Sequence, residues 1–235
     1  MLDFIGTTVS AGLMVFAVSI LTTFMQVPRA TKLILAGCCG LWIGLCAAAA
    51  AAGIIAESKP FPLIAPFVAF PLLVAAIAAA FPAGRAAMMS IPITALIGVN
   101  FGRVLAVQFL MLEAQGRLGG PFPFFAGWGD IITAVFALPV MWLAATTGLK
   151  YWPVIAAWNL FGTADLVNAI ALGVTSAEGS ALQIFHTPPG SEAMQHLPFS
   201  FVPTVLVPFY LITHAIVWAH LIRQRPSAAV VGARR

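Results

Sequence analysis

Seven long runs of apolar residues, hardly interrupted by charge, constrain this chain more than any other feature of its sequence. A helix that crosses the hydrocarbon core of a bilayer needs about 20 mostly apolar residues. The runs reach that length and are continuous, without the alternation of a barrel strand, so each predicts a membrane-spanning helix. We expect the spans at about residues 4–25, 33–56, 62–82, 91–114, 128–148, 152–174 and 201–222.

The third run has prolines in its first half, at Pro62, Pro66 and Pro71. Proline is tolerated in a membrane helix where neighbouring groups satisfy the carbonyls that it leaves free. This run therefore predicts a kinked span. Asp3 and the lack of basic residues ahead of the first run favour an uncleaved first span over a signal peptide.

Charge is scarce along the whole chain. Only 8% of the 235 residues are charged and 61% are hydrophobic, whereas a soluble domain carries about 25% charged residues. Lipid is therefore the expected solvent for most of the surface, and we predict an all-α, polytopic transmembrane bundle as a single domain over residues 1–235. No basic stripe or nucleic-acid motif is present, so a nucleic-acid partner is not expected.

The basic residues gather on one side of the predicted bundle. That side has no acidic residue and carries Arg29, Lys32, Arg85, Lys150, Arg223, Arg225, Arg234 and Arg235. The other side carries Asp3, Glu57, Glu113, Glu178 and Glu192 against Lys59 and Arg117. The positive-inside rule then predicts an outer N-terminus, a cytoplasmic tail at 223–235 and a location in the cell inner membrane.

Two outer segments have distinctive compositions. Residues 115–130 combine glycines and prolines with aromatic rings, which favour the membrane–water boundary, so we expect this segment along the outer interface. Residues 175–200 are longer than an ordinary connection and predict a cap over the outer end of the bundle.

Three polar residues are expected near mid-depth, namely Arg103 in the fourth span, Asp165 in the sixth and His214 in the seventh. An ionised side chain that faces lipid there costs at least about 2.5–3.5 kcal/mol. Arginine does not shed its proton in proteins, and Asp165 is the carboxylate expected at matching depth. We therefore predict an Arg103–Asp165 ion pair inside the bundle.

Further polar residues extend this pair towards the outside. Asn100 lies one turn from Arg103 and Asn168 one turn from Asp165, while Asp130 opens the fifth span and Glu113 ends the fourth. Together they predict an outward-facing polar pocket that binds an ion or a small solute. The alternative is an ion pair that only fixes which helix faces turn inward. His214 fits either a neutral, hydrogen-bonded histidine or a proton-responsive site.

Several cofactors are not expected. A retinal Schiff base needs a lysine at mid-depth, but Lys32, Lys59 and Lys150 lie at span ends. A di-histidine haem site needs histidines on different helices, whereas His214 and His220 share one span. The histidines and glutamates of the 175–200 loop lack the tight spacing of a zinc site, so no metal site is predicted.

Small residues recur at helical spacing in two spans, at Gly98 and Gly102 and at Gly37, Gly40 and Gly44. Such faces allow helices to approach closely. They predict tight packing inside the bundle or, alternatively, a dimer or a partner in a membrane complex.

The second half of the chain, about residues 95–222, resembles a widespread family of uncharacterised bacterial polytopic inner-membrane proteins. The matching features are Arg103, G-W-G-D at 127–130, A-L-P at 137–139, W-N at 158–159, D-L-V-N at 165–168 and P-T-V-L-V-P-F-Y-L-I-T-H at 203–214. The resemblance implies a membrane bundle in which these polar residues matter, and it implies no particular reaction.

Three functions remain open. The leading hypothesis is a membrane protein whose polar pocket binds, and in one version transports, a small solute or a proton. A second is an enzyme on a lipid or isoprenoid substrate with Asp130 and Asp165 as acid and base, although no D-D-x-x-D motif is present. A third is a ligand sensor or an accessory subunit of a membrane complex.

Overall fold

The computed structural model describes residues 2–56 and 64–223. Six of its helices are long and apolar enough to cross a membrane, and a bent pair makes a seventh if it counts as one span. The predicted all-α class with membrane-spanning helices is confirmed. The elements are α1 (Leu2–Phe24), α2 (Arg29–Ala51), α3 (Ile64–Ala80), α4 (Pro82–Met89), α5 (Ile93–Gly98), η1 (Val99–Ala106), α6 (Val107–Ala114), α7 (Phe122–Thr147), α8 (Trp152–Ser176), η2 (Glu192–Gln195), η3 (Val202–Leu206) and α9 (Val207–Arg223).

The third span ends in a sharp corner. Helix α3 continues through Pro71, and the chain then turns by 107° into α4. Pro82 begins α4, where its missing N–H is not needed, and a Cβ on Gly84 would overlap the carbonyl of Ala78. The span is thus bent, but the bend follows Ala80 and does not lie at the prolines of the first half from which a kink was predicted; of these, Pro62 lies outside the described residues.

The fourth span changes its winding at mid-depth. It begins as α5, continues as the 3₁₀-helix η1 and ends as α6. A 3₁₀-helix has about three residues per turn, so residues three apart lie directly above one another. Asn100, Arg103 and Ala106 are all buried, because this winding places them in one row facing the interior.

Helix α7 begins at Phe122, earlier than the predicted start of the fifth span at residue 128. Pro121 precedes the helix and Pro123 lies in its first turn, where the fixed backbone angle of proline suits a helix start. The second half of the segment expected along the interface therefore forms the first turns of α7. This moves Asp130 from the boundary to about two turns inside the helix.

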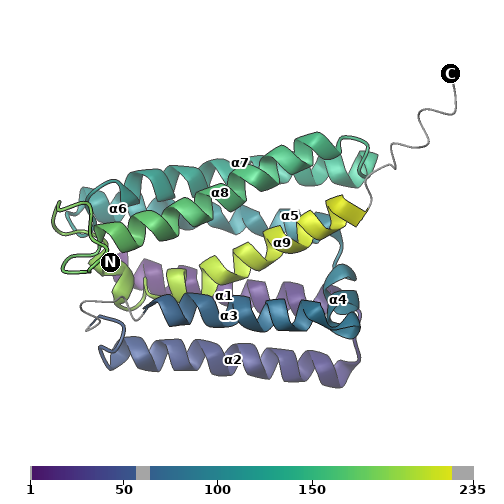
Figure 1. Cartoon of the computed structure of the whole chain (residues 1–235), viewed down its shortest axis with the longest axis horizontal. Helices are drawn as coiled ribbons and strands as arrows, with labels where there is room; N and C mark the ends of the chain where they lie inside the picture. The colour runs from purple at the N-terminus through teal and green to yellow at the C-terminus, as the bar shows by residue number, and fades with distance from the viewer. Residues whose placement is uncertain (1, 57–63, 224–235) are drawn as a thin grey trace, which may run out of the picture.

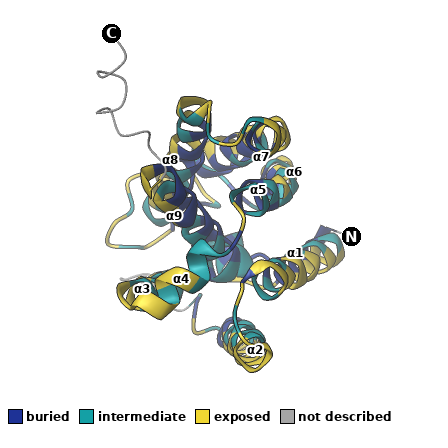
Figure 2. Ribbon diagram, turned by 90° about the vertical axis from the view of Figure 1, so that its right-hand side faces the viewer, coloured by how far each residue is buried: buried dark blue, intermediate teal, exposed yellow. Residues whose placement is uncertain are grey.

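Helices α5 to α9 surround the most buried part of the molecule (Figure 2). Their core includes Leu96, Ile97, Ile155 and Val217. Helices α1, α2 and α3 lie to one side of this group, and α2 lies at the edge of the bundle, farthest from α7 and α8 (Figure 1). The α1–α2 connection, α4, the α7–α8 connection and the end of α9 share one end of the bundle, which brings Arg29, Lys32, Arg85, Lys150 and Arg223 together there.

The 177–200 segment folds onto the opposite end, beside the N-terminus (Figure 1). Its backbone bonds to the end of α8, where the amides of Ile184 and Phe185 both donate to the carbonyl of Thr175. The hydroxyl of Ser191 donates to the carbonyl of Gly173 at 2.6 Å, and Met194 is buried. The segment is therefore packed against the bundle.

Candidate functional site: a buried arginine with two carboxylates

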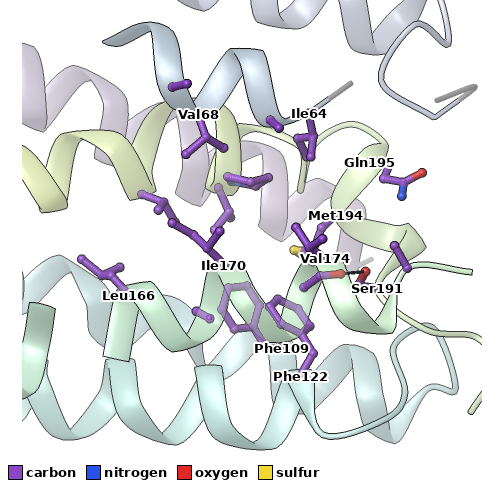
Figure 3. Close-up of a pocket in the computed structure, with 18 of the residues that line it drawn as sticks. Ile64, Val68, Phe109, Phe122, Leu166, Ile170, Val174, Ser191, Met194 and Gln195 are labelled. Atoms are coloured by element: carbon purple, nitrogen blue, oxygen red, sulfur yellow. Dashed lines mark hydrogen bonds between the residues drawn. The ribbon is translucent and has the colours of Figure 1, made fainter. Parts of the chain in front are cut away.

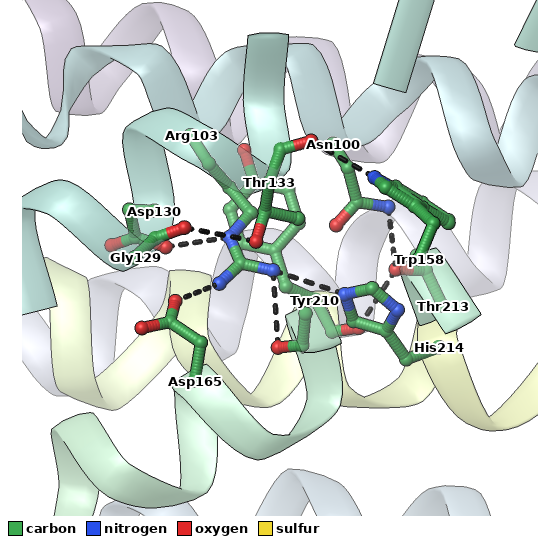
Figure 4. A network of polar contacts seen from close by, with 11 residues as sticks. Asn100, Arg103, Gly129, Asp130, Thr133, Trp158, Asp165, Tyr210, Thr213 and His214 are labelled. Atoms are coloured by element: carbon green, nitrogen blue, oxygen red, sulfur yellow. Dashed lines mark hydrogen bonds and ion pairs between the residues drawn. The ribbon is translucent and has the colours of Figure 1, made fainter. Parts of the chain in front are cut away.

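Arg103 lies at the centre of a buried polar network formed by four spans (Figure 4). Its Nη2 donates to Oδ2 of Asp165 at 2.6 Å, and its Nε donates to Oδ1 of Asp130 at 2.5 Å. The Arg103 side chain is 1% exposed. The predicted Arg103–Asp165 pair is confirmed, and Asp130 is a second carboxylate on the same guanidinium.

The remaining nitrogen of the guanidinium determines which ring nitrogen of His214 carries the proton. Nη1 of Arg103 donates to the carbonyl of Gly162 at 3.3 Å and lies 3.0 Å from Nε2 of His214. A guanidinium can only donate, so Nε2 is the acceptor and the ring proton is on Nδ1. Nδ1 then donates to Oδ1 of Asn159 at 2.7 Å. His214 is therefore a neutral, hydrogen-bonded histidine in this arrangement.

Asn159 holds His214 from two directions. Its Oδ1 accepts from the ring, and its Nδ2 donates to the backbone carbonyl of His214 at 3.1 Å. Both residues are fully buried. This pair joins α8 to α9 beside the guanidinium and fixes the side of the histidine that faces Arg103.

The network carries more negative than positive charge when both aspartates are ionised. Arg103 contributes one positive charge, Asp130 and Asp165 one negative charge each, and His214 none. Each carboxylate uses one oxygen on Arg103, and no donor among the described residues reaches the other oxygen. The site can therefore accept a further proton, hydrogen-bond donor or cation.

Two glycines allow the helices to close around these groups. A Cβ on Gly129 would overlap the carboxylate of Asp165, and a Cβ on Gly162 would lie 2.6 Å from Cε1 of His214. Real Cβ atoms essentially never approach other atoms so closely. The spacing of α7, α8 and α9 at the network therefore depends on the absence of a side chain at both positions.

A cavity of about 280 Å³ reaches the network from the end of the bundle that carries the N-terminus. Figure 3 shows Ile64 and Val68 of α3 on one side, across from Leu166 and Ile170 of α8. Most of its lining is apolar, and Asp130 is the charged residue in that lining. An apolar space thus ends at one carboxylate of the network.

A smaller cavity, of about 40 Å³, lies beside Arg103 and shares Asp130 with the larger one. It is bordered by Ser10 and Gln108, and the side-chain oxygen of Gln108 is buried without a hydrogen-bond partner. A space of this size exceeds the ~10–15 Å³ that one water needs. Asp130 therefore lies between the larger apolar cavity and a small one that also borders Arg103 and the unpaired oxygen of Gln108.

The other residues of the predicted pocket have different positions. Asn100 is buried, but its amide donates to the carbonyl of Leu96 at 2.9 Å and to Thr213 at 3.5 Å. Asn168 and Glu113 are exposed and line neither cavity. Of the residues in the predicted polar trail, Asp130 therefore lies in the network and borders both cavities, whereas Asn168 and Glu113 lie away from both.

Some members of the site were not predicted from the sequence. Gly129 and Gly162 are two of them, although each lies within three residues of an aspartate. Tyr210 is the third, with its ring centroid 5.8 Å from Cζ of Arg103. The glycines could have been found from their proximity to charged residues in apolar helices, whereas nothing in the sequence around Tyr210 indicates this contact.

Gly98 and Gly102 behave as the sequence predicts for packing inside the bundle. A Cβ on Gly98 would lie 2.6 Å from the sulfur of Met141, and one on Gly102 would lie 2.7 Å from Leu13 and Tyr210. A Cβ on Gly40, or on either of the other two glycines of α2, would meet no atom of the described residues within 4 Å. Close packing is thus confirmed for the fourth span.

The helices and their buried polar network define a polytopic membrane protein. The chain belongs to the family described as Domain of unknown function (DUF8737), which it matches over residues 60–222. That range includes α3 to α9 and every residue that contacts Arg103 in the network, whereas α1 and α2 precede it. No curated protein and no solved structure matches the chain.

Proposed function

We propose that this protein binds a small amphipathic solute inside the membrane, with the apolar part in the 280 Å³ cavity and a cationic or hydrogen-bond-donating group at Asp130. The observation that supports this most directly is the position of Asp130. Its carboxylate borders the cavity and is bonded to Arg103 through one oxygen only. The volume is close to the ~300 Å³ lower limit of typical ligand pockets.

The charge balance favours a cation or a donor over an anion. Two carboxylates share one guanidinium, and His214 accepts a hydrogen bond from that guanidinium, so it adds no positive charge. A protonated amine at Asp130 would neutralise the excess negative charge in a site enclosed by largely apolar helices, where charges interact more strongly than in water. A proton is the smallest occupant with the same property.

Asp130 is the contact residue in this proposal, and Asp165 is the residue that holds Arg103. The side chain of Asp130 is 13% exposed and that of Asp165 is 6% exposed. Asp130 lines both cavities and Asp165 lines neither. Removal of charge from Asp130 should therefore change ligand preference, while loss of Asp165 should change stability.

We also propose that the cavity faces the exterior of a bacterial cytoplasmic membrane. The support is the segregation of charge between the two ends of the bundle, combined with the positive-inside rule. The cavity is at the end opposite to the basic residues. Transport of the solute or of a proton would be a further property of the same cavity.

Native mass spectrometry of the purified protein tests binding with three probes of equal chain length, n-octylammonium, n-octanol and n-octanoate. We expect n-octylammonium to be retained most. Asp130→Asn should abolish the preference for the ammonium over the alcohol, because the carboxylate that it neutralises is lost.

Two alanines of α8 provide a matched test of the cavity itself. Ala169 lines the cavity and Ala171 is exposed on the same helix. Ala169→Phe should reduce retention of all three probes about tenfold, since the added ring occupies space that the octyl chain would fill, while Ala171→Phe should leave retention unchanged. Equal retention by both variants would reject the cavity as the binding site, and flux of n-octylammonium in proteoliposomes would separate transport from binding alone.

A further inference from the structure

We propose that a groove at the basic end of the bundle binds an anionic phospholipid, with the phosphate between Arg85 and Arg223. The groove has a volume of about 600 Å³ and lies between α4 and the last turns of α9. Figure 1 shows α4 near the C-terminal end of α9. The 280 Å³ cavity is lined by Met194 and Gln195, which belong to the segment packed on the opposite end of the bundle. This site is independent of the proposed solute site.

Charge supports an anionic ligand. Arg85 and Arg223 line the groove, and neither forms an ion pair with any described residue. The described acidic residues lie at the opposite end of the bundle or in the Arg103 network. Both guanidiniums keep their charge, so a phosphate group is a partner of the right sign and geometry for them.

The walls of the groove are held in place. Nε2 of His220 donates to the carbonyl of Ile91 at 3.1 Å, which links α9 to the segment that follows α4. The hydroxyl of Ser90 accepts from the amide of Gln26 at 2.8 Å and fixes the end of α4 to the α1–α2 connection. Because α4 turns by 107° from α3, it lies across the end of the bundle and carries Arg85 towards α9.

The rest of the lining distinguishes a lipid from a free anion. Met89, Ala219 and Ile222 form apolar walls beside the arginines, and Ile222 is 64% exposed. This combination of basic residues with apolar surface at a bundle end is typical of sites for anionic lipid headgroups. An acyl chain would cover the apolar wall, whereas inorganic phosphate would leave it uncovered.

The test uses full-length protein in nanodiscs of dioleoylphosphatidylcholine that contain a minor fraction of dioleoylphosphatidylglycerol. Native mass spectrometry after release measures the ratio of the two lipids retained. At about 1 kcal/mol per basic residue near the surface, each of Arg85→Gln and Arg223→Gln should lower the preference for the anionic lipid about fivefold, and the double variant about thirtyfold.

Lys150→Gln is the matched control, since Lys150 is at the same end of the bundle but does not line the groove. It should change the preference less than about twofold. An equal loss in this control, or an unchanged preference in the double variant, would overturn the site. Inorganic phosphate that displaces the retained dioleoylphosphatidylglycerol at low concentration would overturn the assignment to a lipid.

Discussion

Helices α1 and α2 differ from the spans around Arg103 in how much of their surface the protein itself covers. Among the 18 most apolar consecutive residues of each span, 22% are buried in α1 and 17% in α2, against 33% in α8, 44% in α7, 50% in the Ile93–Ala114 span and 56% in the Val202–Arg223 span. Helices α1 and α2 face lipid with apolar side chains and hold no buried ionised group. A charge at mid-depth is tolerated only where other helices surround it.

The same division appears in the family match, which covers residues 60–222 and leaves out α1 and α2. Helix α2 is attached to the rest of the bundle partly through Trp42. The indole Nε1 donates to the carbonyl of Thr204 at 3.1 Å, and the ring stacks on Phe70 with centroids 4.8 Å apart. All residues of the Arg103 network lie within the family match, whereas α2 lies outside it and packs onto the bundle that contains the network.

The largest effect should come from Arg103→Leu, which leaves two carboxylates buried without their partner. Removing one partner of a buried ion pair costs about 3–5 kcal/mol. The unfolding temperature in detergent, followed by tryptophan fluorescence, should therefore fall strongly. Replacing Asp130 and Asp165 by Asn in the same variant should recover much of the loss.

Arg117→Leu is the control for this prediction. Arg117 pairs with Asp3 at 2.8 Å, but the two side chains are 38% and 61% exposed, and such a pair contributes about 0–1 kcal/mol. Similar decreases in unfolding temperature for Arg103→Leu and Arg117→Leu would contradict the distinction between a buried and an exposed ion pair.

An intermediate effect is expected from Gly129→Ala. The added methyl group would overlap the carboxylate of Asp165, and such overpacking costs about 1–3 kcal/mol. A Cβ added at Gly40 on α2 meets no atom of the described residues within 4 Å, so Gly40→Ala should leave the unfolding temperature unchanged. Unfolding temperatures of the two variants, compared in one detergent, would sharpen the comparison, and an equal decrease would break it.

The smallest effect should follow Trp42→Phe, which removes one hydrogen bond between α2 and η3 and keeps an aromatic ring. We expect a loss of about 1 kcal/mol or less. Hydrogen–deuterium exchange should become faster in α2 and stay unchanged in α7 and α8. Faster exchange throughout the network helices would show that α2 is needed for the core.

The sequence predicted the Arg103–Asp165 pair because both residues lie at similar depth in separate spans, and a guanidinium at that depth needs an anion. It misplaced Asp130 because the start of α7 was predicted at 128. From the observed start at Phe122, Asp130 is about two turns deeper, where its carboxylate reaches Arg103. A helix start set by prolines thus decided whether this residue belonged to the boundary or to the network.

Helix type explains why Asn168 and Asn100, each three residues from a charged residue of the network, have different positions. Asn168 follows Asp165 by three residues in an α-helix, a rotation that leaves it about 60° away from the same direction, and it is exposed. Asn100 precedes Arg103 by the same spacing in a 3₁₀-helix, where three residues make a full turn, and it is buried. The apolar pattern predicts a helix in both spans but does not distinguish between the two windings.

The winding of η1 also sets the length of the fourth span. A 3₁₀-helix rises about 2.0 Å per residue and an α-helix about 1.5 Å, so the eight residues of η1 extend the fourth span by about 4 Å without lengthening its sequence. That extension is comparable to the differences in thickness between biological membranes, which proteins otherwise match by tilting. The pitch of η1 therefore sets the separation of α5 and α6 along the fourth span, with no change in the number of residues.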